Sequence, residues 1–120
     1  MTAPGLALTE SYVIMSVKHT RRADRWITFW RPDNAGYAWR MDWVGRYDAD
    51  RVKEQPGYYD NSHGTYAIPA AFVEARAVEC EDDSGVGFRV PNSSSMRRKM
   101  VRAAIRARVS RARAAEALDA

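Results

Sequence analysis

The pattern of apolar and polar positions predicts β-strands in three stretches of the first half of the chain. Residues 12–18, YVIMSVK, are rich in the β-branched and aromatic types that favour strands. Residues 26–30 and 37–43 form two further runs in which every second position carries a related side chain. The residues between these runs, PDNAG, include the proline, asparagine and glycine of a tight turn. The pattern predicts an aromatic β-hairpin over about 25–43, whose first strand lies next to strand 12–18.

The predicted hairpin holds all four tryptophans of the chain. The large side chains of its second strand would share one face, namely Tyr37, Trp39, Met41 and Trp43. The other face would carry Ala38, Arg40 and Asp42. One face is expected to be exposed to solvent, and the other to be buried or in contact with a ligand. We expect the core to hold most of Trp26, Phe29 and Trp39. The sheet edge is expected to hold Trp30, Tyr37 and Trp43, and an aromatic edge strand would pair readily with another copy as a homo-oligomer.

Turn and cap signals divide the second half of the chain. Residues 48–55 predict one or two helical turns capped by Asp48 or Asp50 and ended by Pro56-Gly57. A polar loop, GYYDNSHGTY, follows, and IPAAFVEA then predicts a short helix with a proline in its first turn. ARAVEC and VGFRV predict two strands joined by the turn EDDSG.

A final helix is predicted over roughly 95–118, capped by one of Ser93, Ser94 and Ser95. One arc of this helix is mostly alanine, so docking through it would bury little apolar area at each turn. Basic side chains share the opposite arc, namely Arg98, Lys99, Arg102, Arg106 and Arg113.

Together these elements predict a small α+β domain. It would combine a small antiparallel sheet, the aromatic β-hairpin, a short middle helix and a C-terminal Arg/Ala-rich helix. We expect residues 1–11 to form a flexible tail, residues 12–92 a single domain, and residues 93–120 a basic amphipathic helix. A chain of 120 residues can bury one core.

Charge is distributed unevenly along the chain, whose net charge is +4. Residues 96–120 contain eight basic and two acidic side chains, a net charge of +6, whereas residues 1–95 have a net charge of −2. A basic helix of this kind is suited to phosphate backbones, acidic protein surfaces or an anionic membrane face. The chain has no apolar run long enough to span a membrane, and its start does not have the pattern of a signal peptide. Its single cysteine, Cys80, fits a reducing cytoplasm.

Two further stretches offer groups that could bind an anion or a flat ring. The donors of Lys18, His19 and Thr20 follow the first strand and could hold a phosphate or carboxylate. Aromatic and arginine side chains of the hairpin could stack on a ligand and neutralise it. The ligand-binding set predicted from the sequence is Lys18, His19, Thr20, Trp30, Arg31, Tyr37, Arg40, Trp43, Arg46 and, from the tyrosine-rich loop, Tyr59.

Catalytic and metal-binding motifs are missing from the sequence. His19, His63 and Cys80 are scattered without the spacing of a metal site. There is no phosphate-binding glycine loop, dinucleotide fingerprint or nucleophile elbow. We therefore predict no catalytic residue, no metal and no cofactor, and favour binding over catalysis. An enzymatic alternative would use one of the two histidines as a base beside Asp42, Asp48 or Asp60, which only geometry can test.

The segments SVKHT, WITFWRPDNAGY and VGRY, with GYY and AIP further on, resemble a group of small uncharacterised bacteriophage proteins. The resemblance covers residues 12–92 and does not include the Arg/Ala helix. It implies a setting in the cytoplasm of a bacterial host, during infection or from a prophage. Accessory phage proteins of this size often act against host defences by binding a host protein or sequestering a nucleotide signal. No activity is established for the group, so the resemblance assigns no residue a role.

Two functional hypotheses follow. The first is a non-enzymatic phage accessory protein, with a counter-defence role, that captures an anionic target such as a nucleotide signal or an acidic host protein. The second is a nucleic-acid-binding protein that acts through the C-terminal Arg-rich helix, with the aromatic domain as a scaffold.

Overall fold

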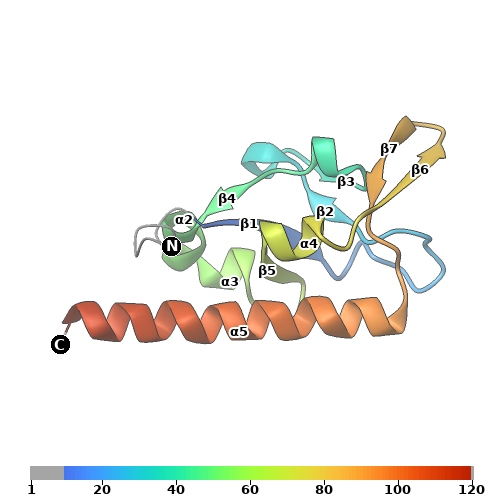
Figure 1. The fold of residues 1–120 in the computed structure, drawn as a ribbon. Helices are drawn as coiled ribbons and strands as arrows, with labels where there is room; N and C mark the ends of the chain where they lie inside the picture. The colour runs from blue at the N-terminus through green and yellow to red at the C-terminus, as the bar shows by residue number, and fades with distance from the viewer. Residues whose placement is uncertain (1–9, 120) are drawn as a thin grey trace.

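Strand β1 (Ser11–Ser16) is the centre of the fold in the computed structural model, which describes residues 10–119. The other strands are β2 (Phe29–Trp30), β3 (Tyr37–Ala38), β4 (Tyr47–Asp48), β5 (Thr65–Pro69), β6 (Val78–Asp82) and β7 (Gly85–Arg89). The helices are α2 (Ala49–Glu54), α3 (Pro56–Tyr59), α4 (Ala70–Glu74) and α5 (Ser94–Asp119), with 3₁₀ helices η1 (Pro32–Asn34) and η2 (Met41–Trp43). The predicted α+β class, with its small antiparallel sheet and long C-terminal helix, is confirmed (Figure 1). Most of the predicted tail over 1–11 lies outside the described residues, and Ser11 already belongs to β1.

All strand pairs are antiparallel. β5 pairs with β1 from Tyr12↔Pro69 to Ser16↔Thr65 and occupies one edge of it. The other edge is shared by β2, through Met15↔Phe29, and by β4, at the opposite end of β1. β3 extends the sheet beyond β2. β6 and β7 form a separate two-stranded hairpin, which projects from the body on the side away from α5 (Figure 1).

Both faces of β1 are buried, since Tyr12 to Met15 are each no more than 2% exposed. Alternate residues of a strand face opposite sides of a sheet, and Val13 and Met15 accordingly belong to one core cluster, while Tyr12 and Ile14 belong to another. Each cluster includes residues of α5. The N-terminal half of this helix is therefore part of the core of the sheet domain.

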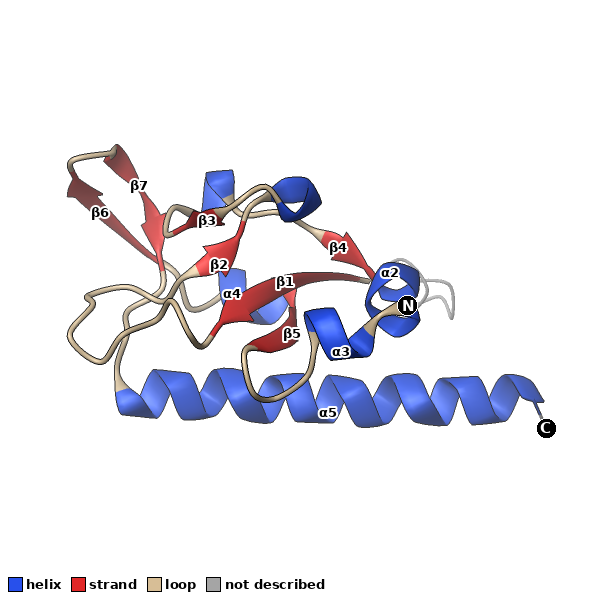
Figure 2. Ribbon diagram, turned by 180° about the vertical axis from the view of Figure 1, so that it is seen from behind, coloured by secondary structure: helices blue, strands red, loops and turns tan. Residues whose placement is uncertain are grey.

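Helix α5 runs along the whole body (Figure 2). Ser93 caps it, because its Oγ accepts a hydrogen bond from Met96 N at 3.0 Å. The predicted alanine arc does face the sheet, with Met100, Ala103, Ala104 and Ala107 buried. Docking does not depend on this small apolar area alone, because α5 also makes buried ion pairs to the body that the sequence analysis did not foresee. None of the described helices is long and apolar enough to cross a membrane.

The predicted hairpin is correct in position but wrong in extent. Only Phe29–Trp30 and Tyr37–Ala38 pair as strands, and Met41–Trp43 form η2 in place of the expected second strand. The turn at η2 is stabilised by hydrogen bonds from Arg40 to Asp42 and from Gly45 N to Trp30 O, the latter at 2.8 Å. A Cβ at Gly45 would lie only 2.6 Å from Pro32 Cα, so this close approach requires glycine. Trp39, expected in the core, is 39% exposed.

Two further elements differ from the sequence prediction. The expected loop over 57–66 is shorter, because α3 occupies Pro56–Tyr59 and β5 begins at Thr65. The first two residues of the expected middle helix, Ile68 and Pro69, belong instead to β5, and the helix begins at Ala70 as α4. The remaining short elements lie near their predicted positions. Asp48 caps α2 by accepting from Arg51 N at 2.8 Å. β6 and β7 overlap the two predicted strands, although β6 begins three residues later than predicted and extends two residues into the predicted turn.

Candidate functional site

An open cleft of about 480 Å³ lies between residues 28–43, which we call the β2–β3 region, and the tip of the β6–β7 hairpin. Its volume is in the range of small-molecule sites, about 300–1,000 Å³. Half of the predicted ligand-binding set lines it, namely His19, Arg31, Tyr37, Arg40 and Trp43. The other lining residues are Thr28, Ala38, Trp39, Asp82, Asp83 and Ser84. Aromatic rings, basic groups and carboxylates therefore meet at one place.

The His19 ring stacks on Tyr37 from β3. The two ring centroids are 3.9 Å apart, with 28° between the ring planes. Ser16 Oγ forms a hydrogen bond with the ring, at 2.9 Å from His19 Nδ1, and also accepts one from His19 N at 3.2 Å. Ser16 is only 2% exposed, so this serine positions the ring and cannot reach a substrate as a nucleophile. Nε2 of His19 has no hydrogen-bond partner among the described residues and is the nitrogen available to a ligand.

Trp39 is fixed by a short chain of hydrogen bonds. Its Nε1 donates to Thr28 Oγ1 at 2.9 Å, and Thr28 Oγ1 in turn donates to His19 O at 2.8 Å. Thr20 lies outside the cleft and fixes the position of Thr28. Its Oγ1 accepts a hydrogen bond from Thr28 N at 3.0 Å and donates one to Ser16 O at 2.7 Å. The polar edge of the indole is thus satisfied, while 39% of the residue stays exposed.

Trp43 carries two guanidinium groups over its ring. Arg31 Cζ lies 5.0 Å and Arg40 Cζ 4.7 Å from the ring centroid, within the range of cation–π contacts. Arg31 also donates from Nε to Tyr37 O at 3.0 Å, which orients its side chain along the hairpin. Within residues 10–119 no carboxylate pairs with Arg31. Its terminal N–H groups are donors that a bound anion could use.

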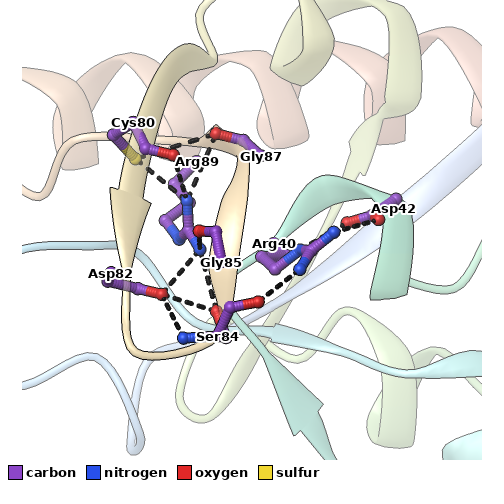
Figure 3. A network of polar contacts seen from close by, with 8 residues as sticks. All are labelled: Arg40, Asp42, Cys80, Asp82, Ser84, Gly85, Gly87 and Arg89. Atoms are coloured by element: carbon purple, nitrogen blue, oxygen red, sulfur yellow. Dashed lines mark hydrogen bonds and ion pairs between the residues drawn. The ribbon is translucent and has the colours of Figure 1, made fainter.

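Arg40 joins the two walls of the cleft (Figure 3). It binds Asp42 through Nε at 3.0 Å and Nη2 at 2.7 Å, and donates from Nη1 to Ser84 O on the other wall. These hydrogen bonds lower the pKa of the Asp42 carboxyl below its usual value. A Cβ at Gly87 would lie 3.0 Å from Arg40 Nε, so the Arg40 side chain packs closely against the backbone of the hairpin there. Arg40 is therefore a structural bridge whose charge Asp42 already balances.

Arg89 holds the hairpin tip from inside (Figure 3). Its side chain is 0% exposed and pairs with Asp82 at 2.7 Å. Nη2 also donates to Ser84 Oγ at 2.8 Å and to Gly85 O at 2.9 Å, while Nη1 donates to Cys80 O at 2.9 Å. The pKa of Asp82 is lowered, first by the hydrogen bond from the Ser84 hydroxyl and further by Arg89. The exposed carboxylate of Asp83, at the same tip, has no such partner among the described residues.

The other half of the predicted set lies outside this cleft. Lys18 is exposed on the connection after β1, and Arg46 pairs with Glu74. Trp30 and Tyr59 belong to a second aromatic cluster, with ring centroids 5.7 Å apart, and Tyr59 is only 3% exposed. The structure thus places Tyr59 in the core rather than on a recognition loop.

The predicted basic arc of α5 is exposed at every position, namely Arg98, Lys99, Arg102, Arg106 and Arg113. In the described part of the chain none of these five side chains forms an ion pair. Two arginines that were not predicted face inward instead. Arg108 and Arg111 both bind Asp60, whose side chain is 1% exposed, at 2.9 and 2.8 Å. The hydrogen bond to Asp60 raises the pKa of Arg108 above its usual value.

Sequence reasoning missed the contribution of the distant hairpin to the cleft. The sequence indicates an ordinary turn at Asp82, Asp83 and Ser84, and the hydrogen bond from Arg40 to Ser84 O ties this turn to the aromatic residues. The expectation that Trp39 belongs to the core follows from the need of a small domain for large apolar side chains, yet Trp39 lines the cleft. Over residues 10–119 no group of three histidine, cysteine or acidic side chains is placed to hold a metal ion.

Comparisons with known proteins give no match. No protein-family model matches the chain, and neither a curated protein nor a solved structure does. The chemistry of the cleft is therefore the basis for assigning a ligand.

Proposed function

We propose that this protein is a binding module that captures a nucleotide in the cleft between the β2–β3 region and the β6–β7 hairpin. The observation that carries the proposal is the placement of Arg31, a cation without a carboxylate partner among the described residues, beside three exposed aromatic rings. A nucleotide combines the flat ring and the anionic group that such a site can hold together.

The aromatic residues supply the stacking surface. Tyr37 is 45% exposed, and Trp39 and Trp43 are each 39% exposed, although all three are anchored by neighbouring groups. Stacking of a base on an aromatic side chain contributes about 1–3 kcal/mol. Rings that are fixed before the ligand arrives also lose less conformational entropy on binding. The cleft thus offers a prepared platform for a planar ring.

The charged groups define which ligands fit. The terminal N–H groups of Arg31 and Nε2 of His19 are available to a phosphate. Arg40 contributes less, because Asp42 balances its charge. Asp83 would repel a ligand that is only anionic, but its carboxylate can accept hydrogen bonds from N–H groups on a base edge. This combination favours a nucleotide whose base carries N–H donors over inorganic phosphate or a polyphosphate.

Tryptophan fluorescence measured during titration with a panel of nucleotides tests this proposal. We expect a purine nucleotide to change the emission saturably, and Arg31→Ala to raise its dissociation constant by about tenfold or more, because a charged hydrogen bond contributes about 1.5–3 kcal/mol. Arg22→Ala is the matched control, since Arg22 is exposed outside the cleft. Equal affinities for the wild type and Arg31→Ala, or no saturable change with any nucleotide, would refute the proposal.

A phage accessory role, in which the cleft sequesters a nucleotide signal of the host, extends this proposal to the setting that the sequence resemblance implies. Sequestration needs tight binding and no chemical step, which agrees with the absence of a catalytic motif in the sequence. Native mass spectrometry of protein purified gently from a bacterial host would test it. A bound nucleotide mass in the wild type that is lost in Arg31→Ala is expected, whereas a clean protein mass for both would favour capture of a host protein.

A further inference from the structure

The β6–β7 hairpin presents an outer face that the cleft does not use. Its register places Glu79 opposite Phe88 and Glu81 opposite Val86. All four residues are exposed, with Phe88 at 52% and Val86 at 57%. Same-face residues of one strand are about 7 Å apart. The outer face therefore carries two carboxylates in a row along β6 and two apolar side chains in a row along β7.

Helix α5 carries a matching arrangement on its outer face. Ile105 and Val109, one turn apart, are 45% and 44% exposed. Arg102 and Arg106, also one turn apart, lie beside them, each three residues before one of the two aliphatic residues. One turn of helix rises about 5.4 Å, close to the spacing of the hairpin side chains. Neither arginine has a carboxylate partner among the described residues.

We propose that the outer face of the hairpin docks on the outer face of α5 in a second copy of this chain. Glu79 and Glu81 would face Arg102 and Arg106, while the apolar row of β7 would pack on the apolar row of α5. Both charge and apolar surface are complementary in this arrangement. A nucleic acid would satisfy the arginines but would offer no apolar partner to the two exposed aliphatic side chains beside them. For this reason the observations favour a second copy over a polyanion.

The arrangement of the elements makes this contact intermolecular and open-ended. The hairpin projects away from α5 in both views (Figures 1 and 2), so a chain cannot place its own hairpin on the outer face of its own helix. The two partners use different surfaces, and such contacts leave a free hairpin at one end and a free helix at the other. The inner face of the hairpin, with Asp82 and Arg89, is not involved, so the cleft stays open in the assembly. Only a few side chains of each copy take part, so we expect a weak, concentration-dependent association.

Sedimentation velocity of nuclease-treated protein, over a concentration series at low and high salt, tests the proposal with two variants. The hairpin variant is Glu79→Arg/Glu81→Arg, and the helix variant is Arg102→Glu/Arg106→Glu. We expect the wild type to associate with rising concentration and to dissociate at high salt. Each variant alone should weaken association by about tenfold or more, because like charges then meet across the contact. Arg21→Glu/Arg22→Glu, on the exposed connection after β1, is the matched control and should associate like the wild type.

Mixing the two variants gives the sharpest result. Each variant retains one intact face, and the two altered faces also carry opposite charges, so an equimolar mixture should associate by alternating the two variants. Combining all four substitutions in one chain should restore association. The proposal is overturned if the wild type stays monomeric throughout the series, if either variant associates like the wild type, or if the mixture remains monomeric. Association that disappears on nuclease treatment would also overturn it and would assign the basic face of α5 to nucleic acid.

Discussion

At the scale of single residues, Arg89 shows how strongly the wall of the cleft depends on one buried charge. Its guanidinium satisfies carbonyl groups around the β6–β7 turn and pairs with Asp82, while its Nε remains buried without a partner. Most of the hydrogen bonds that shape the tip thus converge on one side chain. A buried charge of this kind is retained only where its surroundings compensate its desolvation.

Replacing Arg89 with alanine should therefore destabilise the protein strongly. We expect Arg89→Ala to lower the free energy of unfolding by about 3 kcal/mol, because it leaves buried carbonyls and Asp82 without their donor. Chemical denaturation followed by circular dichroism measures the loss, and the exposed Arg22→Ala serves as control. An unfolding midpoint equal to that of the wild type would show that the hairpin does not need this arginine.

At the scale of elements, Asp60 attaches the long helix to the body. It follows α3 directly, accepts from Ala67 N in β5 at 3.0 Å, and binds two arginines of α5. One carboxylate thus connects the end of α3, β5 and the part of α5 that follows Ala107, the last buried alanine of the helix. The guanidinium of Arg111 additionally lies 4.8 Å from the ring centroid of Tyr12 in β1.

Asp60→Asn should loosen the C-terminal half of α5. The amide keeps the shape of the side chain but removes the charge that faces two arginines, and Arg111 is only 11% exposed in its side chain. We expect a loss of about 2–3 kcal/mol in the free energy of unfolding, together with faster amide exchange after Arg108. Asp50→Asn, the same change at an exposed position of α2, is the control. Unchanged exchange rates in α5 would contradict this role of Asp60.

The elements that sequence patterns predict well are those determined locally. The cap at Asp48, the serine before α5 and the turn between β6 and β7 all act within a few residues, and the structure has each of them. The segment 39–43 alternates like a strand, yet it turns, because Arg40 binds Asp42 beside it and Ser84 from the distant hairpin. The sequence does not indicate β5, because the asparagine, glycine and proline around it are typical of loops. Pairing with β1 over five residues nevertheless stabilises it as a strand.

At the scale of the whole molecule, the cleft is assembled from three segments that are far apart in the sequence. The connection after β1 supplies His19, the β2–β3 region supplies the arginines and tryptophans, and the β6–β7 tip supplies Asp83. The sequence indicates the basic members and two of the aromatic ones, Tyr37 and Trp43, since arginine and aromatic residues near a turn already suggest a binding surface. It could not find the acidic wall, because nothing local in EDDSG indicates which surface the turn will meet.

The most direct test of nucleotide capture uses the four tryptophans as separate reporters. Their indole N–H groups give four resonances in a ¹H–¹⁵N NMR spectrum, which single Trp→Phe variants would assign. Trp39 and Trp43 line the cleft, whereas Trp26 is 8% exposed and Trp30 belongs to the second aromatic cluster. Nucleotide addition is predicted to shift the Trp39 and Trp43 resonances saturably and to leave those of Trp26 and Trp30 in place. Shifts confined to Trp26 and Trp30, or no shift at any indole, would contradict the assignment of this cleft as a nucleotide site.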